Sequence, residues 1–190
     1  MYRAATTIRA EFEQALTSPG SSEPRTAVGE FFQQGPRHFA LRFSQPAGDA
    51  IIADADVVWI YLPSTAKGQV MKMPAEAGTG LDFFNQLLRT TRRSFTVTVG
   101  ADTTISGHAV RAFQLVPKHP SSPFTRAALW IGRDDSRLWQ LETVESSGSL
   151  RRVRFTRIRF DTPLPRGTLT FVPPPGMRVI DQAALLGGKP

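Results

Sequence analysis

The residues that could perform chemistry in this chain are few, and they do not form a complete catalytic pattern. Ser64 and Lys67 have the S-x-x-K spacing of serine acyl-enzymes. That chemistry needs the serine at the start of a helix, whereas Pro63 and Gly68 hold this pair between two expected strands. The companion S-D-N and K-T-G motifs are missing from the sequence. We therefore expect no acyl-enzyme chemistry at this site.

The histidines, acidic pairs and glycines lack the spacing of a metal or cofactor site. His38, His108 and His119 are far apart in the sequence and do not have metal-ligand spacing. Asp134-Asp135 follows a glycine in an expected turn, where aspartate is common for local backbone reasons. Gly78-Thr79-Gly80 lacks the third glycine and the preceding strand of a dinucleotide site. The chain has no cysteine, so thiolate sites are excluded. We expect no cofactor, no metal and no enzymatic activity.

The composition is that of one ordinary globular domain with a basic surface. Of 190 residues, 41% are hydrophobic and 21% are charged, and no stretch approaches 18 uninterrupted apolar residues. We therefore expect a single domain over residues 1–190 that does not span a membrane. The formal net charge of +7 suits nucleic acid, anionic lipid or an acidic protein, or simply a solvated basic face.

Four arginines in one segment are the basis of a nucleic-acid alternative. Arg152, Arg154, Arg157 and Arg159 would give a steeply salt-dependent affinity for DNA or RNA. The segment does not show an aromatic-basic platform of the stacking type. We expect no nucleic-acid partner.

Alternation of apolar and polar residues with a period of two is the dominant signal along the chain. Residues 8–12 and 39–43 show it clearly. Further strands are expected over residues 57–62, 70–73, 95–99, 110–116, 127–131 and 138–144. Short turn signals separate them, including one at residues 100–102. Short connections between neighbouring strands predict an antiparallel meander.

One strand changes the parity of its apolar positions. Val153 and Phe155 share a face, but the next apolar pair, Ile158 and Phe160, has the opposite parity. This slip near Thr156 predicts a β-bulge, which would bend the sheet.

A single segment has the apolar spacing of an amphipathic helix. Thr79 can cap its N-terminus, and Asp82 lies in the first turn, where the helix dipole favours it. Its apolar stripe consists of Leu81, Phe83, Phe84, Leu87 and Leu88. One helix of about three turns covers only part of a sheet of roughly ten strands. We therefore expect a mostly β (α+β) protein in which a curved sheet and a lid helix enclose an apolar cavity.

Several segments resemble, in order, those of a known family. They are an F-x-Q strand at Phe12, a long hairpin from Gly29 to Pro46, a W-x-Y-x-P strand ending at Pro63, the helix over residues 80–90, and an F-x-P-P-x-G-x-x-V segment from Phe171. Together they span about residues 4–181 and resemble the outer-membrane lipoprotein carrier protein family (LolA).

This resemblance implies a fold and a function. The family fold is an unclosed antiparallel β-barrel whose concave side is covered by helices. The implied function is that of a periplasmic chaperone that binds lipoprotein acyl chains in a hydrophobic cavity and carries them from the inner to the outer membrane. The implied partners are acylated lipoproteins, an inner-membrane lipoprotein-releasing transporter and an outer-membrane acceptor. We expect a monomer. No apolar leader follows Met1, so we expect that the leader and part of the N-terminal helix have been trimmed.

The resemblance also suggests which side chains hold the cargo. We expect aromatic and methionine side chains to line the cavity, because such residues form adaptable apolar surfaces. They are Phe12, Phe39, Phe43, Trp59, Tyr61, Met71 and Met73. Leu81, Phe83, Phe84, Leu87 and Leu88 of the lid helix would fill the empty cavity and move aside for cargo.

One position departs from the family pattern. The family commonly has an arginine before the proline of the long hairpin, and this arginine bonds to the lid helix, but here the position is Gly35. Arg37 and Arg42 lie nearby without matching it. Two alternatives share the expected fold: a lipid or glycolipid shuttle, and an envelope-stress sensor of exposed protein segments.

Overall fold

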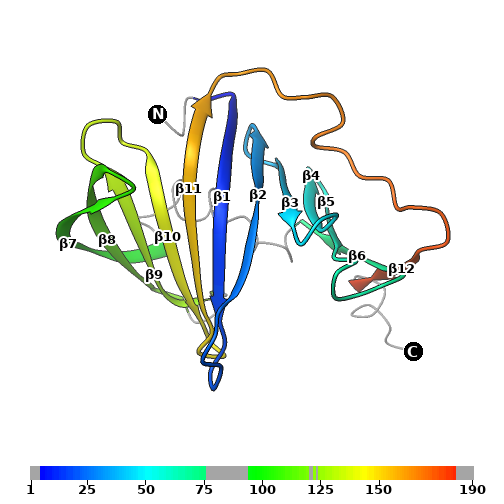
Figure 1. Cartoon of the computed structure of the whole chain (residues 1–190), viewed down its shortest axis with the longest axis horizontal. Coiled ribbons are helices and arrows are strands. Elements are labelled where there is room, and N and C mark those ends of the chain that lie inside the picture. The colour runs from blue at the N-terminus through cyan, green and yellow to red at the C-terminus, as the bar shows by residue number, and fades with distance from the viewer. Residues whose placement is uncertain (1–4, 76–93, 120–121, 123, 183–190) are drawn as a thin grey trace. The chain divides into compact units, whose positions relative to one another are not determined.

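The chain forms β-strands over most of its described length. The computed structural model describes residues 5–75, 94–119, 122 and 124–182. Within these ranges there are twelve strands (Figure 1). The first six are β1 (Thr7–Thr17), β2 (Arg25–Gln34), β3 (His38–Gln45), β4 (Ala50–Asp54), β5 (Val57–Tyr61) and β6 (Gln69–Pro74). The others are β7 (Phe95–Ile105), β8 (His108–Pro117), β9 (Phe124–Gly132), β10 (Leu138–Glu145), β11 (Leu150–Phe160) and β12 (Arg178–Asp181).

The strands follow one hydrogen-bonded order with two ends. This order is β12-β6-β5-β4-β3-β2-β1-β11-β10-β9-β8-β7. Neighbours joined by short turns pair antiparallel, as the sequence predicts. The pairing of β12 with β6 is parallel, which the prediction of a simple meander missed. The parallel pairing is possible because residues 161–177, here called the connecting segment, carry the chain from β11, in the middle of the strand order, to the end next to β6 (Figure 1).

The described residues divide into two compact units. The β4 unit contains residues 5–11, 28–75 and 159–182, and the β8 unit contains residues 12–27 and the described residues from 94 to 158. The helix expected over residues 81–88, with Leu81, Phe83, Phe84, Leu87 and Leu88, lies outside the described residues.

In the β4 unit the strand registers separate the side chains into two faces. Ile51 lies opposite Leu41 on one side and opposite Ile60 on the other. Ile60 in turn lies opposite Met71. Directly opposite residues project from the same face of a sheet, so these four residues share one face. This Met71 face comprises Phe31, Phe39, Leu41, Phe43, Ile51, Ala53, Val58, Ile60, Met71 and Met73.

The intervening residues of the same strands form the second face of the β4 unit. Ile52 lies opposite Ala40 and Trp59, and Ala50 lies opposite Tyr61. This Trp59 face comprises Glu30, Phe32, Ala40, Arg42, Ala50, Ile52, Trp59, Tyr61 and Lys72. Residues 50–53 of β4 are buried without interruption, so apolar side chains from this strand are covered on both faces.

In the β8 unit the two faces differ in polarity. The mainly apolar face, here called the Leu115 face, also contains the polar residues Asp102, Arg111, Thr143 and Arg151. Its apolar members are Phe95, Val97, Val99, Phe113, Leu115, Ala127, Leu129, Ile131, Leu141, Val153 and Phe155. The opposite face, here called the Glu142 face, mixes polar and apolar residues and comprises Val110, Ala112, Gln114, Val116, Ala128, Trp130, Gln140, Glu142, Val144, Arg152 and Arg154.

Two irregularities in the strands lie where the sequence predicts a turn or a β-bulge. Residues 100–102 were expected as a turn, but β7 continues through them, and its register against β8 shifts between Val99 and Asp102. The turn follows instead at Ser106 and Gly107, which both have positive φ. The expected parity slip in β11 is present. Arg157 has a φ of 50°, and the alternation of buried residues changes phase across it.

Candidate functional site

The Met71 face is the candidate site because it joins buried apolar side chains to partly accessible ones. Phe39, Val58 and Met73 are buried and give the face a fixed base. Phe43, Ile60 and Met71 are only half-buried, so they retain accessible apolar area. Each accessible CH₂ group can gain about 0.8 kcal/mol by leaving water, so the face can hold an apolar chain without a polar anchor.

Methionine makes part of this face adaptable. Met71 and Met73 project from the same face of β6, opposite Ile60 and Val58. The Sδ atom of Met71 accepts a hydrogen bond of 3.3 Å from Nε2 of Gln182. A flexible thioether can follow apolar ligands of differing shape, which suits a site that must accept varied chains.

The Trp59 face is covered by the connecting segment. Leu164, Leu169 and Phe171 of this segment pack on a buried cluster. That cluster consists of Phe32, Ala40, Ala50 and Ile52. The ring of Phe171 lies 5.7 Å from the ring of Trp59 and 5.5 Å from that of Tyr61, measured between centroids. The chain itself therefore shields the apolar side chains of this face from water.

Arg42 holds the connecting segment against this face. Its Nε donates a hydrogen bond of 3.0 Å to the carbonyl oxygen of Thr168. Its Nη2 donates bonds of 2.9 Å to Gly167 and 3.1 Å to Thr170. The planar fork of a guanidinium can reach several carbonyls at once, and this one therefore fixes a turn of the segment. Burial lowers the pKa of Arg42 from its ordinary value.

The start of the connecting segment is anchored on β1. The backbone N–H and the hydroxyl of Thr6 donate bonds of 2.8 and 2.9 Å to Oδ1 of Asp161. The N–H of Asp161 donates in return to the carbonyl of Thr7. The backbone hydrogen bond from Thr6 is the largest cause of the lowered pKa of Asp161, because it favours the charged carboxylate.

The structure divides the residues expected to line one cavity. Phe39, Phe43, Met71 and Met73 lie together on the Met71 face. Trp59 and Tyr61 lie on the opposite face, against Phe171. The separation follows from strand parity, because Ile60 projects to the Met71 face and its two aromatic neighbours must project to the other. Trp59 and Tyr61 therefore do not share a sheet face with Phe39, Phe43, Met71 and Met73.

The seventh residue of that set, Phe12, belongs to the β8 unit and is 2% exposed. The Leu115 face of the same unit is a second apolar surface. Leu115 and Leu141 form part of its buried base, whereas Val97 and Val99 are 37% and 61% exposed. Like the Met71 face, this surface combines a packed base with accessible aliphatic groups.

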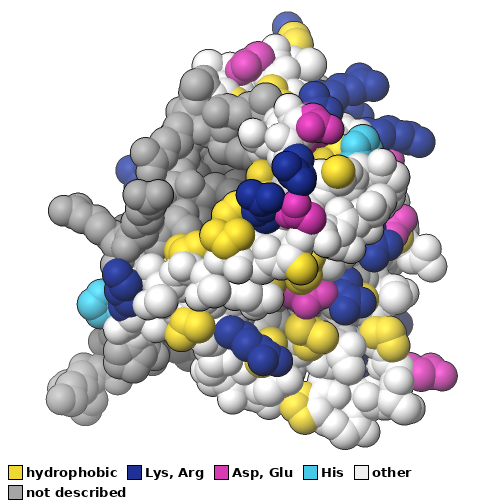
Figure 2. All heavy atoms as spheres, turned by 90° about the vertical axis from the view of Figure 1, so that its left-hand side faces the viewer, with side chains coloured by type: hydrophobic (Ala, Val, Ile, Leu, Met, Phe, Trp, Pro, Cys, Tyr) yellow, Lys and Arg dark blue, Asp and Glu magenta, His cyan; other side chains and the backbone are white. Residues whose placement is uncertain are grey.

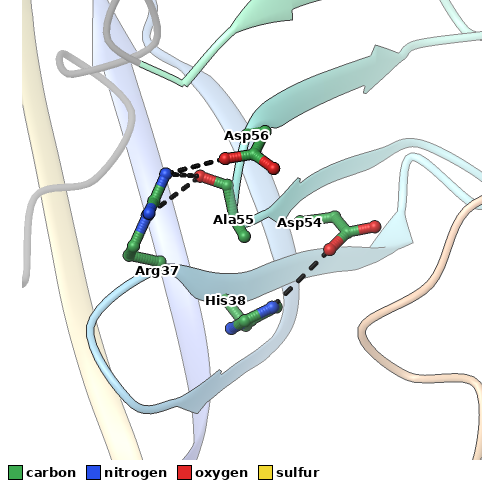
Figure 3. Close-up of polar contacts among 5 residues, drawn as sticks. All are labelled: Arg37, His38, Asp54, Ala55 and Asp56. Atoms are coloured by element: carbon green, nitrogen blue, oxygen red, sulfur yellow. Dashed lines mark hydrogen bonds and ion pairs between the residues drawn. The ribbon is translucent and has the colours of Figure 1, made fainter.

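The two arginines near Gly35 bind other groups of the β4 unit. Arg37 donates from Nε and Nη2 to the carbonyl of Ala55, at 3.1 and 2.8 Å, and from Nη2 to Asp56 at 2.9 Å (Figure 3). Arg42 binds the connecting segment. Gly35 itself has a φ of 60° and donates its N–H to Thr6. Both arginines therefore serve contacts different from the lid contact of the family pattern.

Ser64 and His108, two residues that could perform chemistry, have structural partners. The hydroxyl of Ser64 donates to Oδ2 of Asp49 at 2.6 Å, and its N–H donates to Oδ1 at 3.1 Å, so Asp49 fixes the turn after β5. The ring of His108 stacks on Trp139. Within the described ranges, no group of three or more His, Cys, Asp or Glu side chains could hold a metal ion. Among the same residues, no helix has the length and apolar character needed to cross a membrane.

Two contributors to this architecture are not predicted from the sequence. Phe171 matches a family motif, but the motif does not indicate that it covers the Trp59 face. Arg42 lies near the position of the family's lid contact, but it binds the connecting segment instead. The signal available in the sequence was the uninterrupted apolar run of residues 50–53, which predicts a strand buried on both faces.

Comparisons with known proteins match nearly the whole chain. The family model described as "Outer membrane lipoprotein carrier protein LolA" matches residues 3–172. A protein of Methylobacillus flagellatus named outer-membrane lipoprotein carrier protein is 24% identical over 181 residues, which are 95% of this chain and 85% of that protein. A protein of Methylibium petroleiphilum with the same name is 26% identical over 177 residues, 93% of this chain and 83% of that protein.

A solved structure shares the fold. A protein of Thermus thermophilus described as uncharacterized and conserved superposes with a TM-score of 0.59 at 13% sequence identity. The match covers 94% of this chain and 92% of that one. The mostly β class with an open strand order, expected from the sequence, is confirmed. The match of the family model over residues 3–172 assigns this chain to the LolA family of outer-membrane lipoprotein carrier proteins.

Proposed function

We propose that this chain is a periplasmic chaperone that binds the acyl chains of lipoproteins and carries them from the inner to the outer membrane. The observation that carries the proposal is the Met71 face, where half-buried Phe43, Ile60 and Met71 stand on a buried apolar base. Relatives at 24% and 26% identity are named as carriers of this kind, which supports the same assignment.

The energetics of the cargo explain why such a face is useful. Two acyl chains of roughly 16 carbons each would cost on the order of 25 kcal/mol if fully exposed to water. The carrier must offset most of this cost and still release the cargo, so a shallow and adaptable surface serves better than a rigid pocket. The donor in this scheme is an inner-membrane lipoprotein-releasing transporter, and the recipient is an outer-membrane acceptor.

The lining proposed for the acyl chains is revised from the sequence expectation. In the β4 unit it consists of Phe39, Phe43, Met71 and Met73 with Leu41 and Ile60. The Leu115 face of the β8 unit supplies a second apolar surface. Contact between Phe12 of this unit and the acyl chains stays a prediction. The lid role of Leu81, Phe83, Phe84, Leu87 and Leu88 also stays a prediction.

The test is to identify what the protein carries. The chain is co-expressed with a triacylated lipoprotein, purified without detergent and examined by intact mass spectrometry. The matched control is the same lipoprotein with its lipid-bearing cysteine replaced by serine. We expect the acylated form to co-purify and the unacylated form to be absent. Bound free lipid without lipoprotein would instead support a lipid shuttle, and equal recovery of both forms would contradict acyl-chain recognition.

A further inference from the structure

The two end strands of the hydrogen-bonded order are protected to different degrees. An end strand presents unpaired N–H and C=O groups that can pair with another chain, and short length or charged side chains normally prevent this. β12 has four residues and begins and ends with the charged residues Arg178 and Asp181. β7 has eleven residues, and residues 95–101 within it carry no charge and no proline.

The outward-facing backbone groups of β7 can be identified from its pairing with β8. Lys118 donates its N–H to the carbonyl of Ser94 at 2.9 Å, so these two residues form a hydrogen-bonded pair. Such pairs alternate along an antiparallel ladder, so Thr96 and Thr98 also bond toward β8. The N–H and C=O groups of the residues between them, at positions 95, 97 and 99, point away from β8.

The second half of β7 is less suited to further pairing. The register shifts between Val99 and Asp102, which twists the strand locally. The Asp102 carboxylate accepts hydrogen bonds of 2.7 and 3.0 Å from Arg111 and one of 2.7 Å from Arg133. This charged cluster protects the edge from Asp102 onward, so an added strand has only residues 95–99 available.

The exposed side chains of this segment complement themselves. Val97 and Val99 are exposed on the Leu115 face, and Thr96 and Thr98 are exposed on the other. Figure 2 looks onto the side of Figure 1 where β7 lies and shows apolar side chains at the surface among basic and acidic ones. Read from either end, the sequence Phe-Thr-Val-Thr-Val alternates an apolar residue with threonine. The two directions differ only in the terminal residue, which is phenylalanine at one end and valine at the other.

We propose that this edge pairs with β7 of a second copy of the chain, antiparallel about a two-fold axis at Val97. Val97 then lies opposite its own copy, Phe95 opposite Val99, and Thr96 opposite Thr98. Aromatic–β-branched and Thr–Thr cross-strand pairs stabilise sheets, and no like charges meet because the segment is uncharged. The outward groups of three residue pairs each exchange two backbone hydrogen bonds in this register.

The extent of the contact sets its strength. Five paired residues bury less than the roughly 1,200–2,000 Å² of a stable interface. The dimer therefore dissociates on dilution, and it replaces the monomer expected from the sequence only at high concentration. Val97 and Val99 also belong to the Leu115 face, but the pairing depends on the backbone edge of β7, so it can be measured without cargo and tested separately from the proposed carrier function.

Sedimentation velocity over a dilution series of about three orders of magnitude tests the proposal. We expect a concentration-dependent dimer in the parent chain. Val97→Lys should weaken it by about tenfold or more, because two lysines would then face each other across the axis. The matched control is Val116→Lys, which adds the same charge at a 54% exposed position on β8. A parent that is monomeric throughout, or a dimer weakened equally by both variants, would overturn the proposal.

A cross-link provides a second measurement that locates the axis. The chain has no cysteine, so Val97→Cys introduces a single thiol. Opposite residues of a hydrogen-bonded antiparallel pair have Cα atoms about 5.5 Å apart, within the range of a disulfide. Mild oxidation should link two Val97→Cys chains and leave Val116→Cys chains unlinked. Equal cross-linking of the two variants would show random collision instead, and pairing of β7 only with an added extended peptide would assign the edge to another partner.

Discussion

The two units of this protein use their sheet faces differently. In the β4 unit both faces are apolar, and the Trp59 face is covered by the connecting segment through Phe171 and Arg42. In the β8 unit the Leu115 face is apolar, whereas the Glu142 face carries an ion pair between Arg152 and Glu142. An alternating strand therefore needs one covering layer, and an uninterrupted apolar strand needs two. The contrast indicates which apolar surfaces the chain covers itself and which it leaves partly accessible.

The largest expected effect is on the buried strand of the β4 unit. Ile52 is fully buried on the Trp59 face, so Ile52→Ala should lower the free energy of unfolding by about 3 kcal/mol. Val144→Ala, at a half-buried position on the Glu142 face, should cost about 1 kcal/mol. Urea denaturation followed by circular dichroism measures both. Equal losses would mean that the Trp59 face and the Glu142 face do not differ in the way described.

Phe171, which covers the Trp59 face, should make the next largest contribution to the free energy of unfolding. Phe171 is half-buried against Trp59 and Tyr61, so Phe171→Ala should cost about 2 kcal/mol, roughly half the value for a fully buried ring. The neighbouring Val172 is 83% exposed, and Val172→Ala should change stability by less than about 0.5 kcal/mol. If the two variants unfold at the same urea concentration, Phe171 does not act as a cover.

Replacing Arg42, which fixes the connecting segment, should lower the free energy of unfolding by a smaller amount. Arg42→Ala removes charged donors to three carbonyls, and the site is partly solvated, so we expect a loss of about 1–2 kcal/mol. Arg42→Lys should recover only part of this, because an ammonium lacks the planar fork. Limited proteolysis should cut residues 161–177 faster in Arg42→Ala. As a control, Arg154→Ala on the Glu142 face should leave the cutting rate unchanged.

The smallest effect is a pH dependence at the start of the connecting segment. The folded-state pKa of Asp161 is lowered by its hydrogen bonds from Thr6, so its contribution to stability is present above the unfolded pKa of about 3.9. That contribution is lost as the pH falls through the lower folded value. The stability difference between the parent and Asp161→Asn should thus be constant near neutral pH and shrink under acid conditions. A difference that does not vary with pH would refute the role of the charged carboxylate.

Much of the fold could be predicted because strand periodicity is a local property. The strands around residues 39–43, 57–62 and 127–131 and the parity slip in β11 all follow from the order of apolar residues. The continuation of β7 through residues 100–102 could not be distinguished from a turn, because Gly100 and Asp102 suit either a turn or an irregular strand.

The site was harder to predict because sharing a face is a property of register. Alternation shows that Trp59 and Tyr61 lie on one face of β5, but not that this face is opposite to that of Met71. Knowing this requires the pairing of Ile60 with Met71 and the contact of Phe171 with the aromatic pair. The parallel pairing of β12 with β6 depends similarly on the path of the connecting segment, which local sequence does not encode.

The most direct test of the central claim compares two neighbouring residues of β6 that project from opposite faces. Met71→Glu places a carboxylate on the Met71 face, and Lys72→Glu places the same group on the other. Binding of a fluorescent triacylated lipopeptide is measured by titration, with the fold of each variant checked by circular dichroism. We predict at least about tenfold weaker binding for folded Met71→Glu and little change for Lys72→Glu, because only the first charge must be buried against the acyl chains. Unchanged binding in Met71→Glu, or equal losses in both variants, would contradict the assignment of the acyl chains to this face.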